Sequence, residues 1–298
     1  MKTLSEKPKI IFNIAGGFGK NIAASAVVRL LSEKYPHHSM IVTSPYKDAW
    51  ANNPYVEKVV DLEKTPEFFE TYLKSGENIL FLQDPYNTED FVYKRKHLIE
   101  IWCDICGIKY DGSMPQLFFT EKEREKVKAA LPQDKPLFII QTSGGYINQS
   151  YPISWARDLP LGTAQEIVNR MRNEGYEVIH IRRENQYGLE GAIRPPLDSL
   201  REFLCALQFT DRRLLIDSAP EHAAAALALS STVVWIVNSP NVFGYKMHHN
   251  ILPQIEEKFR HNPDAYLDRY NIWGTLHEHP YDTDQIFNVE EIIKTLLE

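Results

Sequence analysis

The chain has 298 residues, of which 43% are hydrophobic and 24% charged, and its formal net charge is −7 with a pI near 5.8. This composition is typical of a globular protein and gives no overall attraction to nucleic acid or anionic lipid. No apolar run approaches the ~20 residues needed to span a bilayer, and residues 1–9 carry no signal-peptide core. We therefore expect a cytoplasmic protein without a transmembrane segment.

The cysteine and histidine pattern predicts no metal site and no cofactor. Three cysteines are too few for a disulfide framework in a chain of this length. Cys103 and Cys106 form a C-x-x-C pair inside an apparent helix, but no second pair accompanies them. His277 and His279 lie two residues apart near the C-terminus, and further ligands of the kind zinc requires are missing. Core thiols are the preferred interpretation.

The first half of the chain alternates short apolar runs with helical patterns. Lys9 to Ile14 predicts a first, central strand, and the glycine-rich turn Ala15 to Lys20 leads from it into a helix. The turn is neither a Walker A loop nor G-x-G-x-x-G, because Asn21 and Ile22 occupy required positions. Three more strands are predicted at 40–43, 58–62 and 78–83, followed by a long amphipathic helix from Thr88 to Cys106 that ends at Gly107.

A second series of the same kind follows the polar, proline-flanked segment at residues 132–136. Its strands are predicted at 137–141, 177–181, 214–216 and 233–237, with helices at 164–173, 200–207 and after Ser218. Alternating strands and helices indicate a mainly parallel sheet in each half. We therefore expect an α/β protein of two Rossmann-like domains, residues 1–133 and 134–298, that face each other across a cleft. The last helix, Asn288 to Glu298, is a candidate to pack back on the first domain.

Asp217 to Val237 combines the end of a strand, a capped helix start and a second strand. Ser218 and Glu221 are spaced as a capping box, and Pro220 falls in the first helical turn. The alanine run Ala223 to Ala226 is small enough to let the helix lie close against a sheet. Free N–H groups at such a helix start favour an anion such as phosphate. An ordinary strand–helix–strand element without a ligand is the alternative.

The residues around this helix carry a resemblance to a known family. Residues 217–225, DSAPEHAAA, resemble the signature Asp-Ser/Thr-Gly-Pro-x-His-x-x-Ala, with Ala219 in place of its glycine. Weaker similarity lies in Gly19 with its helix and in residues 51–59, 115–119, 142–145, 152–155 and 198–204. On these motifs the chain resembles the ADP-heptose:lipopolysaccharide heptosyltransferase family. Members of that family are inverting glycosyltransferases with the GT-B fold of two Rossmann-like domains.

The resemblance implies a nucleotide-sugar donor held mainly by the second domain, with its diphosphate at the helix start near Ser218. Asp217 would contact the donor sugar, and His222 would lie by the diphosphate. The other implied donor contacts are Ser143, Gly144, Arg182, Arg183 and Glu221. Exposed charges are the alternative reading of the two arginines, and a core histidine is the alternative reading of His222.

The sequence departs from the family at the expected general base. The family's aspartate after the first glycine turn is replaced here by Lys20, and a protonated lysine cannot accept a proton from a hydroxyl. Asp84, at the end of the fourth predicted strand, is the substitute candidate, and a turn aspartate before Pro85 is its alternative. Lys20 could instead hold a phosphate or an acidic acceptor group.

The expected function is inverting transfer of a sugar from a nucleotide diphosphate to an acceptor hydroxyl, without a required metal. The acceptor is left open between a saccharide, a lipid-linked saccharide and nucleic acid. A glycosyltransferase acting on a modified DNA base is one alternative, because Tyr93 to His97 is the densest basic run and could contact phosphates. A solvated helix face is the other reading of that run. A non-catalytic nucleotide-binding module of the same fold is the third possibility.

Overall fold

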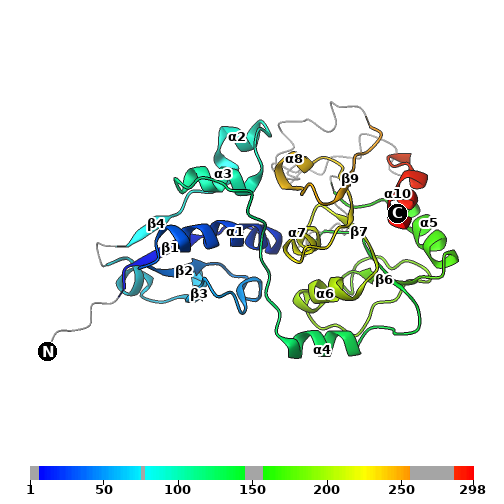
Figure 1. Cartoon of the computed structure of the whole chain (residues 1–298), viewed down its shortest axis with the longest axis horizontal. Coiled ribbons are helices and arrows are strands. Elements are labelled where there is room, and N and C mark those ends of the chain that lie inside the picture. Colours follow the sequence, from blue (N-terminus) through cyan, green and yellow to red (C-terminus); the bar gives the residue numbers. More distant parts are fainter. Residues whose placement is uncertain (1–6, 75–77, 145–156, 256–284) are drawn as a thin grey trace.

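The computed structural model describes residues 7–74, 78–144, 157–255 and 285–298. Within these ranges the chain forms a four-stranded sheet in the order β3-β2-β1-β4 and a five-stranded sheet in the order β6-β5-β7-β8-β9. The described strands all pair in parallel, as predicted. Figure 1 shows the sheets in two lobes that lie side by side, each with its own helices. The predicted α/β fold of two Rossmann-like halves is confirmed.

The first lobe follows the predicted order of elements. Its strands are β1 (Lys9–Asn13), β2 (Ser39–Thr43), β3 (Lys58–Val60) and β4 (Ile79–Phe81). Its helices are α1 (Phe18–Lys34), α2 (Glu89–Val92) and α3 (Leu98–Ile105). Its short helical segments are η1 (Lys47–Trp50), η2 (Leu62–Lys64), η3 (Phe69–Leu73) and η4 (Pro85–Asn87). β1 lies inside the sheet, between β2 and β4, as the sequence predicts.

The second lobe adds elements that the sequence did not predict, α8 and β9. Its strands are β5 (Leu137–Gln141), β6 (Glu177–Ile181), β7 (Arg212–Ile216), β8 (Thr232–Val234) and β9 (His249–Ile251). Its helices are α4 (Glu121–Ala129), α5 (Leu161–Asn173), α6 (Leu200–Ala206) with η5 (Leu207–Phe209), α7 (Ala219–Ala226), α8 (Pro240–Phe243) and α10 (Val289–Leu297). β5, the first strand of this half, is again internal.

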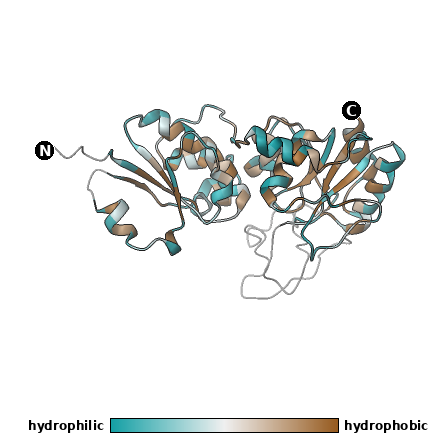
Figure 2. Cartoon of the chain, turned by 90° about the horizontal axis from the view of Figure 1, so that it is seen from below, coloured by the Kyte–Doolittle hydropathy of each residue, from teal (hydrophilic) through white to brown (hydrophobic). Residues whose placement is uncertain are grey.

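Most residues of β1, β2, β5, β6, β7 and β8 are buried on both faces, which explains their near-continuous apolar sequence. In β1, Ile10 and Phe12 belong to the large core cluster that includes α1, whereas Ile11 lies in a smaller cluster with Ile41 and Val60. Figure 2 shows hydrophobic strands through the middle of each lobe and hydrophilic helix faces outside. Burial of these strands positions their carboxyl ends, where the candidate site lies.

The long helix predicted from Thr88 to Cys106 is wrong, because α2 and α3 are separate helices. Lys94, between them, has φ of 54°, a left-handed conformation that a helix cannot continue through. His97 then has an extended backbone and starts α3, its Nδ1 accepting a hydrogen bond from the backbone N–H of Ile99 at 3.2 Å. A single left-handed residue leaves the hydrophobic periodicity intact, so the pattern did not reveal the break. The predicted end at Gly107, φ 60°, is confirmed.

The charged helix α4 packs against α6 of the second lobe, although the sequence placed it in the first domain. Figure 1 shows α4 beneath the second lobe, after an extended stretch that descends between the lobes. We therefore propose that the domain boundary lies in residues 108–120, before α4, rather than after Gln133.

The last helix does not follow the arrangement considered from the sequence, in which it packs back on the first domain. α10 contacts α5, β7 and β8 of the second lobe. Its buried residues Ile292, Ile293 and Leu296 lie in the core cluster of that lobe, and Glu290 forms an ion pair with Arg170 of α5 at 2.7 Å. The apolar face that the sequence predicts for this helix is therefore used within its own domain.

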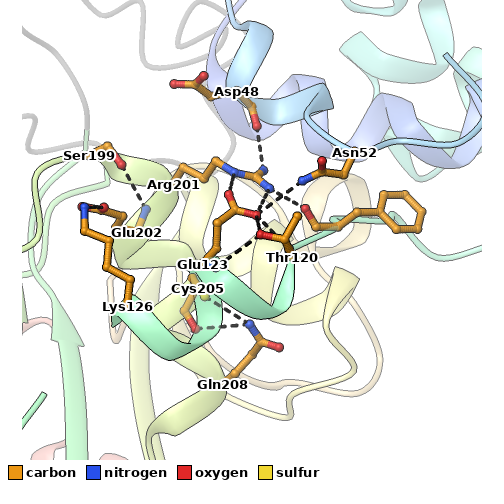
Figure 3. A network of polar contacts seen from close by, with 11 residues as sticks. Asp48, Asn52, Thr120, Glu123, Lys126, Ser199, Arg201, Glu202, Cys205 and Gln208 are labelled. Carbon is orange, nitrogen blue, oxygen red and sulfur yellow. Dashed lines mark hydrogen bonds and ion pairs between the residues drawn. The ribbon is translucent and has the colours of Figure 1, made fainter. Parts of the chain in front are cut away.

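Arg201 of α6 joins the two lobes on the side where the chain crosses between them. Its guanidinium donates to Glu123 Oε1 of α4 at 2.6 Å, to the carbonyl of Asp48 in the first lobe at 2.8 Å, and to the carbonyl of Phe118. Figure 3 shows these bonds radiating from one guanidinium. The guanidinium also lies 4.5 Å from the centre of the Phe119 ring. Arg201 therefore binds the first lobe, the crossing segment and α4 together.

Helices α1 and α7 form the central contact between the lobes, and Figure 1 shows them meeting in the middle of the molecule. Both contain runs of alanine, and Ala23, Ala24, Ala223 and Ala224 are fully buried in one core cluster that spans both lobes. Small side chains let two helices approach closely. The alanine run therefore serves the packing of α7 against α1 as well as against its own sheet.

Candidate functional site

Lys20 and Asp84 lie together at the carboxyl ends of β1 and β4. The Lys20 ammonium is 2.8 and 2.7 Å from the two carboxylate oxygens of Asp84, and it lies 3.6 Å from the centre of the Tyr86 ring. Asp84 Oδ1 also accepts a hydrogen bond from the Tyr86 backbone N–H at 2.9 Å, which caps η4. The lysine is buried, whereas the Asp84 side chain is 23% exposed. The carboxylate thus keeps a face toward solvent.

The glycine turn before α1 makes room for this ion pair. Gly16 has φ of 119°, and a Cβ at this position would come within 2.8 Å of Lys20 Cδ. The helix then starts at Phe18, its N-cap residue Gly17 has no side chain to cap it, and no acidic residue stands in its first turn. A lysine near the positive end of a helix is unfavourable, and Asp84 supplies the compensating negative charge.

Ser218 caps α7 in a different way from the predicted capping box. Its hydroxyl accepts a hydrogen bond from Gln141 Nε2 at 2.8 Å, and the backbone N–H of Glu221 donates to the Ser218 carbonyl instead. The predicted capping box is therefore wrong, and the first turn of α7 has no side-chain cap. Asp217, just before it, is buried and accepts from Asn238 Nδ2 at 2.5 Å.

Ser143 and Gly144 follow β5 and lie beside this helix start. Gln141 Nε2, which also binds the α7 cap, donates to the Ser143 carbonyl at 3.1 Å. The Gly144 N–H donates to Asp158 Oδ1 at 2.8 Å, and its carbonyl accepts from Gln186 Nε2 at 2.9 Å. Because the Gly144 N–H is already bonded, this residue shapes the loop and offers no free N–H to a ligand here.

The two arginines after β6 have different surroundings. Arg182 Nη1 donates to the backbone carbonyls of Arg183, Glu184 and Gln186 at 3.1 to 3.3 Å, so it holds its own loop. Arg183 Nη1 is buried without a hydrogen-bond partner among the described residues. Burial lowers the pKa of Arg183, and the nearby Tyr46 of the first lobe partly offsets this. Of the two, Arg183 is the cation with unused donors.

Glu221 is not placed where a donor could touch it. Its side chain has no exposed surface, and neither carboxyl oxygen has a hydrogen-bond partner among the described residues. Burial, reinforced by the charge of Asp217, raises the pKa of Glu221 well above its ordinary value. The sequence placed this residue among the donor contacts, whereas the structure makes it a buried carboxyl behind the first turn of α7.

His222 lies at the contact between the two lobes. A Cβ at Gly19 of α1 would come within 2.7 Å of His222 Cδ2 and 3.1 Å of the Ala219 Cα, so only glycine permits this approach. His222 Nδ1 is 2.9 Å from the Tyr245 hydroxyl. Burial, aided by the neighbouring His97, His248 and Arg157, lowers the pKa of His222 to about 3, so the imidazole is neutral at physiological pH. The first turns of α1 and α7 therefore meet at this residue.

Aromatic residues that the sequence did not single out complete the contact between the lobes. Tyr86, beside Asp84, packs edge-on against Phe243 of α8, with ring centres 6.2 Å apart. His97, which starts α3, lies 5.2 Å from the ring of Tyr245. These residues stand in short turns without periodicity, so only their aromatic character in a loop could have marked them. They connect the neighbourhood of Asp84 to that of His222.

The basic run Tyr93 to His97 is largely neutralised by neighbouring carboxylates. Arg95 and Lys96 form ion pairs at 2.8 to 3.0 Å, with Glu89, Asp90 and Asp104. A cluster already paired with acids is a poor attractor of nucleic-acid phosphates. The solvated-face interpretation of this run therefore has the better support.

Other predicted features take structural places or fall outside the described residues. Cys103 and Cys106 are buried free thiols, and burial raises the pKa of each to about 12. Residues 152–155 of the family resemblance, and His277 with His279, lie outside the described ranges. Among the helices that the structure describes, none combines the length and the hydropathy that crossing a membrane requires.

Comparisons with known proteins find the same fold in solved structures. No protein-family model and no curated protein matches the chain. A glycosyl transferase family 9 protein from Veillonella parvula DSM 2008 aligns over 97% of both chains at 13% identity, with a TM-score of 0.64. Escherichia coli ADP-heptose lipopolysaccharide heptosyltransferase II aligns over 83% of this chain and 91% of its own at 14% identity, with a TM-score of 0.62.

A third similar structure is TibC from enterotoxigenic E. coli H10407, a dodecameric iron-containing heptosyltransferase solved in complex with ADP-D-β-D-heptose. It aligns over 98% of this chain and 76% of its own at 14% identity, with a TM-score of 0.68. At these identities the likeness concerns the fold. The chain has the GT-B type of architecture, two Rossmann-like lobes, and the fold resemblance predicted from the sequence is confirmed.

Proposed function

We propose that the protein is a glycosyltransferase that moves a sugar from a nucleotide diphosphate to an acceptor hydroxyl, with inversion and without a required metal. The observation that carries this proposal is the meeting of two uncapped helix starts, α1 and α7, at the carboxyl ends of two parallel sheets. Such starts favour phosphate, and ligands of open α/β sheets bind outside the carboxyl ends of the strands. The structural neighbours named as heptosyltransferases add support from the fold.

The donor diphosphate would lie at the carboxyl-end edge of the sheets, beside the helix starts, held by the first turn of α7 and by Arg183. Arg183 supports this placement because it is partly buried and keeps unused donors. Asp217 and Ser143 are near enough to the α7 start to contact the donor sugar and its phosphates. Arg182 and Gly144 contribute by holding the loops, since their donors already have partners.

In the proposed reaction Asp84 takes the proton of the acceptor hydroxyl while the hydroxyl oxygen attacks the anomeric carbon. The bond between that carbon and the diphosphate oxygen breaks, and the diphosphate leaves with the bonding electrons. Its developing negative charge is stabilised by the two helix starts and by Arg183. Lys20 orients Asp84 through two contacts below 3 Å. The acceptor, a saccharide, a lipid-linked saccharide or a base in nucleic acid, approaches from the side of Asp84 that faces solvent.

One observation favours a second candidate, a nucleotide-binding module without catalysis. Both carboxylate oxygens of Asp84 are engaged by Lys20, so the proposed base must release one contact before it can accept a proton. A protein that had lost transfer would keep donor binding through α7 and Arg183. The two candidates differ in whether a bound donor is turned over.

Thermal-shift measurements against ADP-, UDP-, GDP-, CMP- and dTDP-linked sugars test the proposed donor site, because a ligand of the folded state raises the melting temperature. We expect one nucleotide class to stabilise the protein and Arg183→Ala to abolish most of the shift. Arg172→Ala, which removes an exposed cation of α5, is the matched control and should keep the shift. Equal shifts in both variants, or no shift with any donor at millimolar concentration, would contradict the donor site.

Release of nucleoside diphosphate from the stabilising donor then separates the enzyme from the binding module. We expect release by the wild-type protein, at an unchanged rate when a chelator such as EDTA is present. Binding without any release, with a range of saccharide acceptors supplied, would favour the module. Loss of activity with EDTA, restored by a metal ion, would contradict metal independence.

A further inference from the structure

Tyr245 is the closest polar neighbour of His222 and makes a specific contact with it. The Tyr245 hydroxyl lies 2.9 Å from His222 Nδ1, and the two rings are nearly perpendicular, at 88°, with centres 5.7 Å apart. Both side chains are buried, at 5% exposure each. A neutral imidazole has one donor nitrogen and one acceptor nitrogen, so the direction of this bond decides which nitrogen carries the proton.

The surroundings favour the phenol as the donor. Burial raises the pKa of Tyr245 well above its ordinary value, so the phenol keeps its proton. Among the described residues, His222 Nδ1 is the hydrogen-bond partner of this hydroxyl. If Nδ1 carried the proton instead, the phenol hydrogen would be buried without an acceptor, which is costly. Donation from the phenol to Nδ1 satisfies both groups.

Glu221 is the group that could reverse this assignment, since its Oε2 lies 3.1 Å from the same Nδ1. An ionised carboxylate there would attract a proton onto Nδ1. Burial raises the pKa of Glu221 well above its ordinary value, which weakens this attraction, and the contact of Nδ1 with the Tyr245 hydroxyl at 2.9 Å is the shorter one. The surroundings of His222 Nδ1 therefore favour its role as a hydrogen-bond acceptor.

The opposite edge of the His222 ring faces the first lobe. Cδ2, the atom bonded to Nε2, is the part of the ring that approaches Gly19 at the start of α1. An N–H on Nε2, next to Cδ2 in the ring, therefore lies on the edge of the imidazole that faces the starts of α1 and α7.

We propose that Tyr245 is a positioning residue that fixes His222 as the Nε2–H tautomer and so presents a neutral hydrogen-bond donor toward the starts of α1 and α7, where a diphosphate oxygen would accept it. The identity of that acceptor rests on the proposed function, whereas the tautomer does not. A neutral imidazole held in this way binds the diphosphate through one directed hydrogen bond rather than through a charge that depends on pH. His97, packed against the other side of Tyr245, ties this arrangement to the first lobe.

Nitrogen-15 NMR of histidine side chains in the free protein tests the tautomer directly, with a His222→Gln variant to assign the signals. We expect the Nε2–H pattern for His222 in the wild-type protein, unchanged in Glu221→Gln. Tyr245→Phe should convert it to a mixture or to Nδ1–H. Tyr93→Phe, which removes an exposed phenol, is the matched control and should change nothing. An Nδ1–H pattern in the wild type, or an unaltered pattern in Tyr245→Phe, overturns the proposal.

The second part of the proposal, the hydrogen bond from His222 to a diphosphate, is tested with a nucleoside diphosphate whose binding has been detected by calorimetry. Its addition should shift the His222 Nε2 proton, and Tyr245→Phe should lower the transfer rate about tenfold while the fold is kept. A bound diphosphate that leaves the Nε2 signal unmoved overturns this half. If no nucleoside diphosphate binds, the proposed function fails, and the tautomer in the free protein still decides the role of Tyr245.

Discussion

At the scale of single residues, Lys20 stands where the family resemblance led us to expect an aspartate, and its charge is balanced by Asp84, which lies against it. The sequence suggested both residues from their places after predicted strands, and the structure brings them into one ion pair. The sequence could not reveal this ion pair, because β1 and β4 become neighbours only when the sheet forms. Nor could the sequence show that Arg182 binds backbone carbonyls while Arg183 Nη1 has no partner among the described residues, since adjacent arginines look alike in a sequence.

Asp84→Asn tests the proposed general base. We expect the transfer rate to fall by about 100-fold or more, because amide nitrogen and oxygen cannot accept the hydroxyl proton, while donor affinity stays close to that of the wild type. Asp104→Asn, which breaks an exposed ion pair with Lys96, is the control. A rate in Asp84→Asn within about twofold of this control would remove Asp84 from the chemistry.

Gly19→Ala tests the close approach of the lobes. A Cβ there would lie 2.7 Å from His222 Cδ2, so we expect the free energy of unfolding to drop by about 1–3 kcal/mol, as overpacked sites generally do. Gly17→Ala is the matched control, because a Cβ at Gly17 meets nothing within 4 Å. Urea unfolding of both variants makes the comparison. Equal stability of the two variants would mean that the lobes can move apart at Gly19 without loss of free energy of unfolding.

At the scale of elements, apolar runs of three to six residues predicted the strands, since most of these strands are buried on both faces. Two features of the secondary structure were not predicted. The break between α2 and α3 depends on the left-handed Lys94, and β9 depends on pairing with β8, which gives its sequence no strong pattern of its own. Prediction was therefore best where burial alone decides the structure.

Arg201 links three parts of the molecule through its hydrogen bonds: α6, α4 and the first lobe. Replacing it by methionine leaves Glu123 and two carbonyls without their donor, and we expect a loss of about 2–3 kcal/mol in the free energy of unfolding. Arg124→Met, which removes an exposed pair with Glu121, should cost less than about 1 kcal/mol. Urea unfolding measures the stability of both variants. Similar losses would show that the hydrogen bonds of Arg201 contribute no more than an exposed ion pair does.

At the scale of the whole molecule, buried histidines make stability depend on pH. Burial lowers the pKa of His97, His180 and His248 to about 4 and that of His222 to about 3. Each is neutral when folded and takes up a proton near pH 6.5 when unfolded. Their contribution is present above that pH and is lost as the pH falls toward the folded values. Burial raises the pKa of Glu221, so this carboxyl acts in the opposite direction and offsets part of the effect.

We therefore expect the free energy of unfolding to fall by roughly 4 kcal/mol per pH unit near pH 5, for a net difference of about three protons. His180→Asn, which removes one of these buried imidazoles, should reduce this slope by about one proton, or ~1.4 kcal/mol per unit. Denaturant unfolding between pH 4.5 and 7 gives the slope. A flat profile over this range would contradict the burial of these imidazoles in neutral form.

The relation between the lobes is what the sequence could least predict. The alternation of strands and helices indicated two Rossmann-like domains, yet the contacts of His222 with Gly19 and Tyr245 join distant segments through packing alone. The place of α4 on the second lobe and of α10 within it likewise follows from side-chain burial that no local pattern records. The sequence thus predicted the candidate site residues at the ends of separate strands, and only the structure shows which of them lie together.

The central claim is that the starts of α1 and α7 hold the diphosphate of a nucleotide sugar. A crystal structure of the protein with the stabilising donor tests it most directly. The account predicts the diphosphate within hydrogen-bond distance of the first turn of α7, of His222 Nε2 and of Arg183, with the sugar toward Asp84. A diphosphate bound on another face of either lobe, at a concentration that saturates the protein in solution, would contradict it.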